Sequence, residues 1–378
     1  MGGPSAKQSL ICADDLRKIA RQKIPRFAFD FIDGGAGSEL GLARNRAAFD
    51  AELLHPRILR NTDGQLSTAK RFLGREWSVP FGIPPFGMAA MAGSGTDQIL
   101  AASAERNGLP YVASTPASAS LEELKRLAPA NGWFQLYVGR SQDIVDGLIA
   151  RAETAGYETL VVTADVPRPG KRRRDLRNGL TLPLKMTPRM FVDLLRHPGW
   201  SMGMLLNGTP RFANLEPYAA SGAGTHTLAQ LMQGQSSGRL DWELLARIRK
   251  RWSGHLVLKG VLSPLDARTA RDSGVDAVIV SNHGGRQLDA APAPLQMLGG
   301  IRAEVGTDFP LAIDGGLRCG EDILKALLAG ADFAFIGRPF LYSVAARGRE
   351  GPDQLFNLLQ DELLNAMSQI GLRSIQDP

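Results

Sequence analysis

Residues 277–289 read Ala-Val-Ile-Val-Ser-Asn-His-Gly-Gly-Arg-Gln-Leu-Asp, an apolar run that ends in a polar, glycine-rich segment. The run is apolar throughout instead of alternating, which is typical of a parallel strand buried on both faces. In an α/β barrel the functional side chains follow the carboxyl ends of such strands. This stretch therefore predicts one strand of a barrel, over Ala277–Ser281, with His283 and Arg286 at its functional end.

Similar short apolar runs recur along the chain, and most are followed by a segment with helical spacing, such as Ser141–Ala155, Pro264–Ser273 and Glu321–Ala329. Eight strand–helix units in a chain of this length predict a (β/α)8 TIM barrel of the α/β class, with a doubly wound sheet as the alternative. Besides Ala277–Ser281, strands are predicted over Val79–Ile83, Pro110–Ala113, Trp133–Val138, Thr159–Thr163, Leu256–Lys259, Pro310–Ile313 and Phe333–Ile336.

Two stretches stand outside this repeat. Residues 1–75 are predicted to form an N-terminal helical cap, and residues 167–240 a long insertion after the fourth strand, all within one domain spanning 1–378. The insertion carries an apolar patch, residues 186–206, with Met, Leu, Phe and Trp side chains. Irregular stretches of this length are usually functional or mobile.

Composition narrows the class of protein. The chain has 378 residues, a net charge of +6 and two cysteines, Cys12 and Cys319, far apart and outside any metal-ligand spacing. No disulfide scaffold or metal site is expected, and a reducing, cytoplasmic location fits best. The basic run 171–174 lacks interleaved aromatic residues, so no nucleic-acid partner is expected. No apolar segment approaches the ~20 residues of a membrane span, and the N-terminus has no secretory h-region.

Polar residues follow the predicted strands where a barrel places its chemistry. Loops after the seventh and eighth strands are the usual phosphate site of this fold, and here they carry glycines together with Arg318 and Arg338. The other strand ends carry Gln135, Tyr137, Thr163, Asp165 and Lys259.

The sixth strand end is the most specific of these. His283 is the one histidine of five at a strand end within a glycine-rich turn, and imidazole suits proton abstraction near neutral pH. Arg286, three residues on, offers a planar fork for a carboxylate. The pair predicts a site that removes a proton from a small organic acid, and a structural histidine held by its loop is the alternative.

Ser281-Asn-His-Gly-Gly-Arg-Gln-Leu-Asp289 resembles the active-site signature of the FMN-dependent 2-hydroxy acid dehydrogenase/oxidase family. The resemblance runs from about residue 24 to about residue 370. It includes Phe134-Gln-Leu-Tyr137, Thr163-Ala-Asp165, Leu258-Lys-Gly260, Asp314-Gly-Gly316 and Ile336-Gly-Arg-Pro339 in one register.

The resemblance implies a cofactor, FMN, and a role for each matching residue. His283 would be the base, Asp165 would stabilise the imidazolium, Arg172 and Arg286 would bind the substrate carboxylate, and Tyr137 would hydrogen-bond the substrate. Lys259 would lie near flavin N1 and O2, and Arg318, Gly337 and Arg338 would hold the phosphate. The flavin ring and ribityl chain would contact Pro85, Phe86, Gly87, Ser114, Gln135, Thr163, Ser281, Asp314 and Gly316.

The sequence departs from the family pattern at two positions. Phe31 stands where the family usually has a tyrosine that binds the carboxylate, which suggests an aromatic, bulky or esterified substrate. Phe86 stands where a smaller residue is usual. Gly87 is not such a departure: family oxidases tend to have alanine at this position and several dehydrogenases have glycine, so Gly87 favours a dehydrogenase.

The implied reaction is oxidation of an (S)-2-hydroxy acid, mandelate- or lactate-like, with electrons passed to a quinone or, alternatively, to O2. The patch 186–206 resembles the segment that attaches some family dehydrogenases to membranes, and a lid over the barrel is the alternative. A homotetramer is expected. An FMN barrel isomerase and a non-catalytic binding module are the alternatives from other classes.

Overall fold

The computed structural model describes residues 10–180, 187–207, 212–219 and 238–376, and the fold is built on a closed eight-stranded barrel. The sheet order is β3-β10-β9-β8-β7-β6-β5-β4, every ladder is parallel, and a bridge between Ile83 and Tyr111 joins the two ends. The strands are β3 Phe81–Gly82, β4 Tyr111–Ser114, β5 Gly132–Tyr137, β6 Thr159–Thr163, β7 His255–Val261, β8 Ala277–Val280, β9 Leu311–Asp314 and β10 Phe333–Phe335. The TIM-barrel prediction is confirmed, and the doubly wound alternative is wrong.

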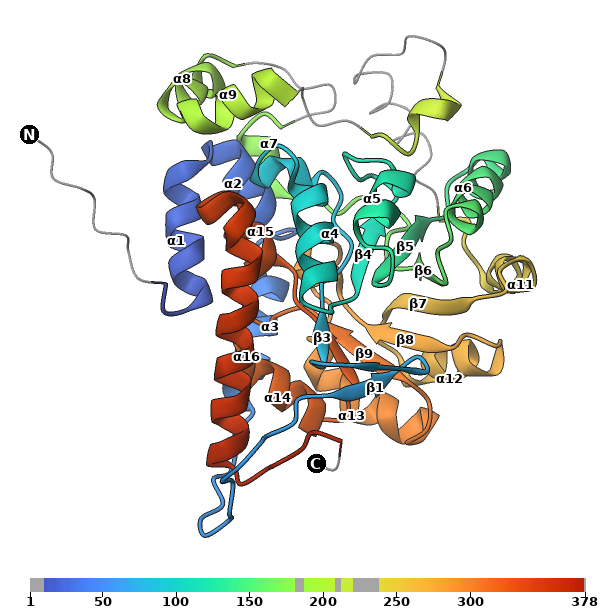
Figure 1. The fold of residues 1–378 in the computed structure, drawn as a ribbon. Helices are drawn as coiled ribbons and strands as arrows, with labels where there is room; N and C mark the ends of the chain where they lie inside the picture. The colour runs from blue at the N-terminus through green and yellow to red at the C-terminus, as the bar shows by residue number, and fades with distance from the viewer. Residues whose placement is uncertain (1–9, 181–186, 208–211, 220–237, 377–378) are drawn as a thin grey trace, which may run out of the picture.

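Helices surround the barrel (Figure 1). Those that follow strands are α4 Thr96–Arg106, α5 Leu121–Leu127, α6 Gln142–Thr154, α11 Trp242–Arg251, α12 Pro264–Asp272, α13 Pro294–Val305, α14 Gly320–Leu328 and α15 Arg338–Arg347, with α16 Gly351–Gln369 after them. Several begin at a side chain that caps the helix: Ser141, Asp241 and Ser263 each accept a hydrogen bond from the backbone N–H three residues on.

Apolar packing on both faces of the strands explains their lack of alternation. One face of each strand packs against helices, and the other fills the barrel interior with residues such as Trp133, Val161, Ile279 and Phe335. A hairpin of β1 Lys70–Phe72 and β2 Arg75–Trp77 extends this interior cluster, and the Phe72 and Phe333 rings stack with centroids 5.0 Å apart. The hairpin was not predicted, since residues 1–75 were expected to be helical.

The N-terminal cap and the insertion lie together in Figure 1. The cap contains α1 Ala13–Lys23, α2 Arg26–Asp33 and α3 Leu40–Ala51. The described part of the insertion contains no strand and the helices α7 Arg173–Arg177, α8 Pro188–Arg196 and α9 Pro198–Asn207. Its residues 181–186, 208–211 and 220–237 lie outside the described part, so the patch predicted over 186–206 is seen only from residue 187 onward.

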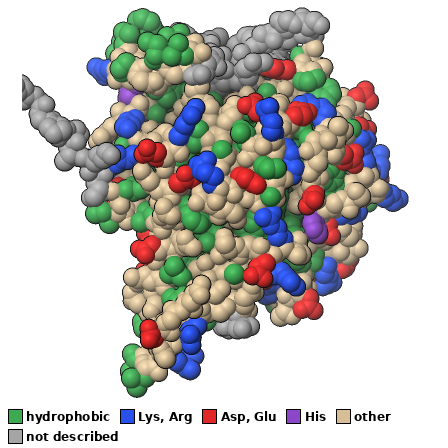
Figure 2. Space-filling view, in the orientation of Figure 1, with side chains coloured by type: hydrophobic (Ala, Val, Ile, Leu, Met, Phe, Trp, Pro, Cys, Tyr) green, Lys and Arg blue, Asp and Glu red, His purple; other side chains and the backbone are tan. Residues whose placement is uncertain are grey.

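Helices α8 and α9 present apolar side chains on both their faces. Met190 and Met204 are buried, and the Trp200 ring meets Phe27 of α2 edge-on at 5.6 Å. The outward side chains are Phe191, Val192, Leu195, Met202, Leu205 and Leu206, which are 46–78% exposed. Figure 2 shows hydrophobic side chains gathered at the upper left of the molecule, over the position of α8 and α9 in Figure 1. Across the described ranges, no helix combines the length and hydrophobicity needed to cross a membrane.

Candidate active site

A cavity of about 820 Å³ opens at the carboxyl ends of the barrel strands. Most of the residues that the sequence predicted for the site line it: Phe31, Pro85, Phe86, Gly87, Tyr137, Thr163, Arg172, Lys259, His283, Arg286, Asp314, Gly316, Arg318, Gly337 and Arg338. The remaining four, Ser114, Gln135, Asp165 and Ser281, lie directly behind this lining and are hydrogen-bonded to it or to each other.

His283 is held by Asp165 in the orientation that a general base requires. Its Nδ1 lies 3.0 Å from Asp165 Oδ1, and its Nε2 lies 3.5 Å from the Tyr137 hydroxyl. Burial would raise the pKa of Asp165, but the adjacent His283 and the nearby Lys259 together lower it, so the carboxylate is ionised. Nδ1–H therefore donates to Asp165, and Nε2 is left as the acceptor that faces the cavity.

The backbone at His283 is strained. Its φ is 57°, in the left-handed region that non-glycine residues seldom adopt, and Gly284 and Gly285 follow with φ of 63° and 74°. The side-chain amide of Asn282 fixes this turn by exchanging two hydrogen bonds with the amide of Asn45 (2.9 and 2.7 Å). The glycine-rich sequence is thus needed to turn the imidazole into the cavity.

Two guanidinium groups flank the Phe31 ring. The Cζ atoms of Arg172 and Arg286 lie 4.9 and 5.1 Å from its centroid. Arg286 Nη1 donates to the carbonyls of Phe31 (2.7 Å) and Gly34 (3.0 Å). Burial, with Arg172 and Arg338 nearby, lowers the pKa of Arg286 well below its usual range. A bound anion would offset this repulsion between buried cations, so the site is suited to a carboxylate.

Lys259 is a buried cation at the base of the cavity. Its Nζ lies 2.7 Å from Asp314 Oδ2 and donates to the Ser281 hydroxyl at 2.9 Å. Burial would lower the pKa of this amine, but Asp314 and Asp165 raise it, so the amine is charged. Asp314 Oδ1 is buried and has no hydrogen-bond partner among the described residues, which suits a hydroxyl-bearing ligand in the cavity.

A chain of hydrogen bonds crosses three neighbouring strands beneath the cavity. Ser114 Oγ donates to Gln135 Oε1 at 2.7 Å, and Gln135 Nε2 donates to Thr163 Oγ1 at 3.0 Å. Because β4, β5 and β6 are adjacent and parallel, their polar ends meet on one surface.

The loops after β9 and β10 form a cationic end of the cavity. Burial lowers the pKa of Arg318 to about 10, and the nearby Arg338 adds to this effect. A phosphate bound between these loops would be stabilised by the two positive charges. Arg338 also makes contacts that the sequence did not predict: its Nε, Nη1 and Nη2 donate to the carbonyls of Ile32, Gly284 and Gly34. Its guanidinium thus also braces the turn after α2.

The segment 85–87 lines the cavity as predicted, and Gly87 is tightly placed. A Cβ at this position would come within 3.0 Å of Pro116 Cγ, so an alanine here would have to displace that ring.

Sequence reasoning missed two features of the site. Asp175 is a buried carboxylate whose Oδ2 lies 3.0 Å from Arg172 Nε, and the i, i+3 spacing from Arg172 was the available signal. Phe212 and Leu215 line the cavity from the middle part of the insertion, held by the buried Asn214, which donates to the carbonyls of Ser114 and Thr115. No local sequence pattern predicts this contact, because Asn214 and its partners are about 100 residues apart in the sequence.

Comparison with known proteins decides the family. The model of the FMN-dependent dehydrogenase family matches residues 20–378. The chain belongs to this family. The family is FMN-dependent, and the cationic end, the buried Lys259 and the unpartnered Asp314 oxygen fit that cofactor. The resemblance stated from the sequence is therefore confirmed.

Characterised family members are similar over nearly their whole length. The chain is 36% identical to (S)-mandelate dehydrogenase of Pseudomonas putida over 368 residues, 97% of this chain and 92% of that one. It is 37% identical to L-lactate dehydrogenase of Caulobacter sp. (strain K31), covering 96% and 95%. The crystal structure of the monotopic membrane protein (S)-mandelate dehydrogenase superposes with a TM-score of 0.94 at 36% identity, covering 97% of each chain.

Proposed function

We propose that this protein oxidises an (S)-2-hydroxy acid to the 2-oxo acid, with His283 as the base. The observation that carries the proposal is the orientation of His283, with Nδ1 on an ionised Asp165 and Nε2 facing a cavity that also holds Tyr137 and two arginines. The known activities of similar dehydrogenases, toward (S)-mandelate and L-lactate, support the substrate class.

The residues divide the work of this reaction. His283 Nε2 takes the substrate proton, and the imidazolium that forms is stabilised by Asp165 at 3.0 Å. Tyr137, whose pKa is raised by burial and by Asp165, keeps its proton and can donate a hydrogen bond to the substrate. Arg172 and Arg286 bind the carboxylate and fix the carbon that reacts.

When bound, FMN would supply the acceptor for the two electrons and for the hydrogen that His283 does not take. Lys259 would supply a fixed positive charge to stabilise the reduced cofactor, and its ion pair with Asp314 keeps that charge in place. Thr163 lines the cavity, and Gln135 and Ser114 behind it hold its hydroxyl in place through a chain of hydrogen bonds. Arg318 and the backbone at Gly316 and Gly337 would hold the phosphate.

Phe31 favours a bulky or aromatic side chain on the substrate, so a mandelate-like acid fits better than a lactate-like one. Its ring supplies apolar surface and no hydroxyl donor, and it lies against the guanidinium groups of Arg172 and Arg286. The carboxylate is then bound by guanidinium groups alone, and the ring is free to contact the rest of the substrate.

We further propose that the electron acceptor is a membrane quinone and that the cytoplasmic protein docks peripherally on the inner face of the membrane through α8 and α9. Six large apolar side chains on these two short helices are outward-facing, whereas a lid would turn them toward the cavity. Arg189 and Arg196 flank them and suit an anionic lipid surface. A similar protein is described as a monotopic membrane protein.

A panel of S and R 2-hydroxy acids tests this function. Each acid is mixed anaerobically with the flavin-loaded enzyme, and bleaching of the flavin is recorded; turnover is then compared with a quinone analogue, a dye and O2. We expect bleaching by S acids with bulky side chains and fast turnover with the quinone. Fast H2O2 production would instead identify an oxidase, and no bleaching by any acid would contradict the proposal.

A further inference from the structure

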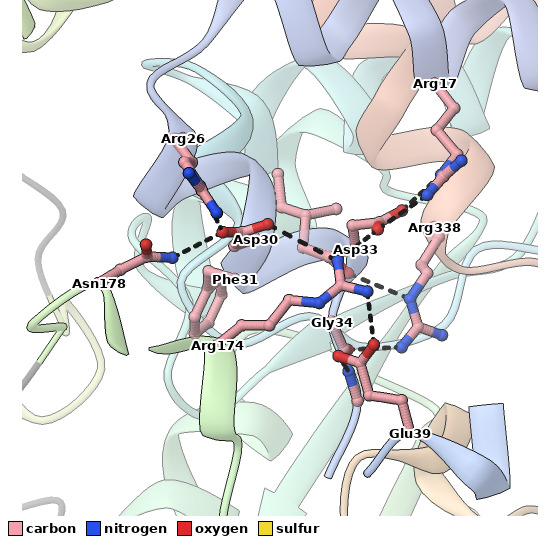
Figure 3. A network of polar contacts seen from close by, with 12 residues as sticks. Arg17, Arg26, Asp30, Phe31, Asp33, Gly34, Glu39, Arg174, Asn178 and Arg338 are labelled. Atoms are coloured by element: carbon pink, nitrogen blue, oxygen red, sulfur yellow. Dashed lines mark hydrogen bonds and ion pairs between the residues drawn. The ribbon is translucent and has the colours of Figure 1, made fainter. Parts of the chain in front are cut away.

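Arg174 joins the first helix of the insertion to the N-terminal cap (Figure 3). Its Nη1 lies 2.8 Å from Asp33 Oδ2 and 3.6 Å from Asp30 Oδ1, and its Nη2 lies 2.5 Å from Glu39 Oε2. The side chain is 32% exposed and does not line the cavity. One planar guanidinium thus bridges the end of α2 and the start of α3.

Asp33 is the buried centre of this network. Besides Arg174, it accepts hydrogen bonds from Arg17 (2.6 and 3.0 Å) and from the Tyr342 hydroxyl (2.7 Å). Burial would raise the pKa of Asp33, but these donors together lower it below its usual range, so it is ionised. If Arg174 is removed, the Asp33 carboxylate keeps its hydrogen bonds with Arg17 and Tyr342 but loses its link to the insertion.

Residues 31–34, the last residues of α2 and the residue after it, connect this network to the active site and are called the 31–34 turn. The carbonyls of Phe31 and Gly34 accept from Arg286, and those of Ile32 and Gly34 accept from Arg338. Gly34 O is shared by both arginines. The position of the turn therefore sets the position of the Arg286 guanidinium, which is attached to it through Nη1.

Arg174 also sets the position of the second arginine that faces Phe31. Arg172 is the N-cap residue of α7, two residues before Arg174. The residue before Arg172 is also bound to the N-terminal helical cap, because the Gly37 N–H donates to the Lys171 carbonyl at 2.9 Å. Anchoring α7 on Asp33 and Glu39 therefore fixes Arg172 against the ring of Phe31.

We propose that Arg174 is a positioning residue that aligns Arg172 and Arg286 for the substrate carboxylate. It acts on Arg172 through α7 and on Arg286 through the 31–34 turn. The inference rests on the proposed function, since it assumes that these two arginines bind the carboxylate. A misplacement on the order of 1 Å of such groups can cost up to about a hundredfold in rate.

The test replaces Arg174 by Met, which keeps the alkyl stem and removes the fork. The matched control is Arg177→Met on the same helix; Arg177 is exposed, and its side chain has no hydrogen bond or ion pair with any residue that the structure describes. The flavin-loaded enzymes are titrated with the 2-oxo acid product while the flavin spectrum is followed, and KM and kcat are measured for the hydroxy acid and for its methyl ester.

For Arg174→Met we expect retained flavin, a product dissociation constant and acid KM about tenfold higher or more, and an unchanged KM for the ester. Arg174→Lys should recover part of the loss, because it keeps the contact with Asp33 but cannot reach Glu39 as well. The control should match the parent. Equal losses for acid and ester, or no loss for the acid, would overturn the inference.

Two further comparisons keep the test decisive. If the parent has the same KM and kcat for the acid and the ester, the proposed carboxylate binding is wrong. If the parent prefers the acid and Arg174→Met prefers it equally, only the role of Arg174 is wrong. Should Arg174→Met fail to fold or to retain flavin, Glu39→Gln removes one charged partner of Arg174 and leaves Asp33 paired. It should raise the acid KM severalfold, and an unchanged acid KM would overturn the inference.

Discussion

Asp165 and His283 are joined by a 3.0 Å contact between Oδ1 and Nδ1, and this contact assigns the two imidazole nitrogens different tasks. Asp165 is nearly buried, and its other carboxylate oxygen, Oδ2, has no partner among the described residues. Among the described residues, the carboxylate therefore makes its side-chain hydrogen bond with the imidazole, and its charge also acts on the nearby Lys259.

Replacing Asp165 by Asn tests this electrostatic role. The amide is nearly isosteric but neutral, so the imidazolium formed during turnover loses its counter-charge. We expect kcat to fall on the order of 10²-fold or more. KM should change little, because Arg172 and Arg286, which bind the substrate carboxylate, are unchanged. Steady-state kinetics of the flavin-loaded variant provide the measurement, and a kcat within a factor of two of the parent would remove Asp165 from the mechanism.

Replacing Phe31 by Tyr should change substrate preference. A phenol between Arg172 and Arg286 can donate to a carboxylate, and a charge-assisted hydrogen bond contributes roughly 1.5–3 kcal/mol. Small aliphatic acids should gain about tenfold or more in kcat/KM relative to bulky ones, since the pocket is also narrowed. The ratio of kcat/KM values across the panel is the readout. If that ratio stays constant, Phe31 does not contact the substrate.

Replacing Leu195, Leu205 and Leu206 by Ser tests the docking surface. These side chains are 66–78% exposed, so the changes should leave the fold and turnover with a soluble dye intact. Cosedimentation with anionic phospholipid vesicles should be lost. The control replaces Leu265 and Leu328, which are also exposed but lie on α12 and α14, and should bind vesicles like the parent. A parent that does not sediment at low salt contradicts membrane docking, and altered substrate selectivity in the triple variant would support the lid.

Asp97 predicts a pH dependence of stability. It is fully buried beside the Ser118 N–H and the Tyr111 hydroxyl, and burial raises its pKa to about 6. The folded state therefore holds a proton between about pH 4 and 6 that the unfolded state releases, so this group's contribution to the unfolding free energy falls as pH rises through that window.

The neutral variant Asp97→Asn should not show this loss. Its stability relative to the parent should increase from pH 4 to pH 6.5 by an amount on the order of 2 kcal/mol, which is most of the equivalent of the pKa rise. Thermal unfolding midpoints of the two flavin-loaded proteins, measured across this range, give the difference. A difference that does not vary with pH would show that Asp97 titrates normally.

Local sequence patterns predicted the barrel because its strands are buried on both faces and its functional groups follow them directly. For this reason His283, Lys259 and Asp314 were found before the structure, and the structure brings them to one cavity. The hairpin 70–77 was missed, because its packing against Phe333 depends on a residue more than 250 positions away. The bracing of Arg286 and Arg338 by the 31–34 turn was missed for the same reason, and the homotetramer stays a prediction.

The central claim is that His283 takes the substrate proton, and anaerobic reduction of the flavin in His283→Ala tests it most directly. The parent and the variant, both loaded with FMN, are mixed with the preferred S acid, and the rate of bleaching is measured in a single turnover. Loss of a general base predicts a rate lower by about 10²–10⁴-fold with the flavin still bound. Reduction of the variant at close to the parent rate would contradict the account.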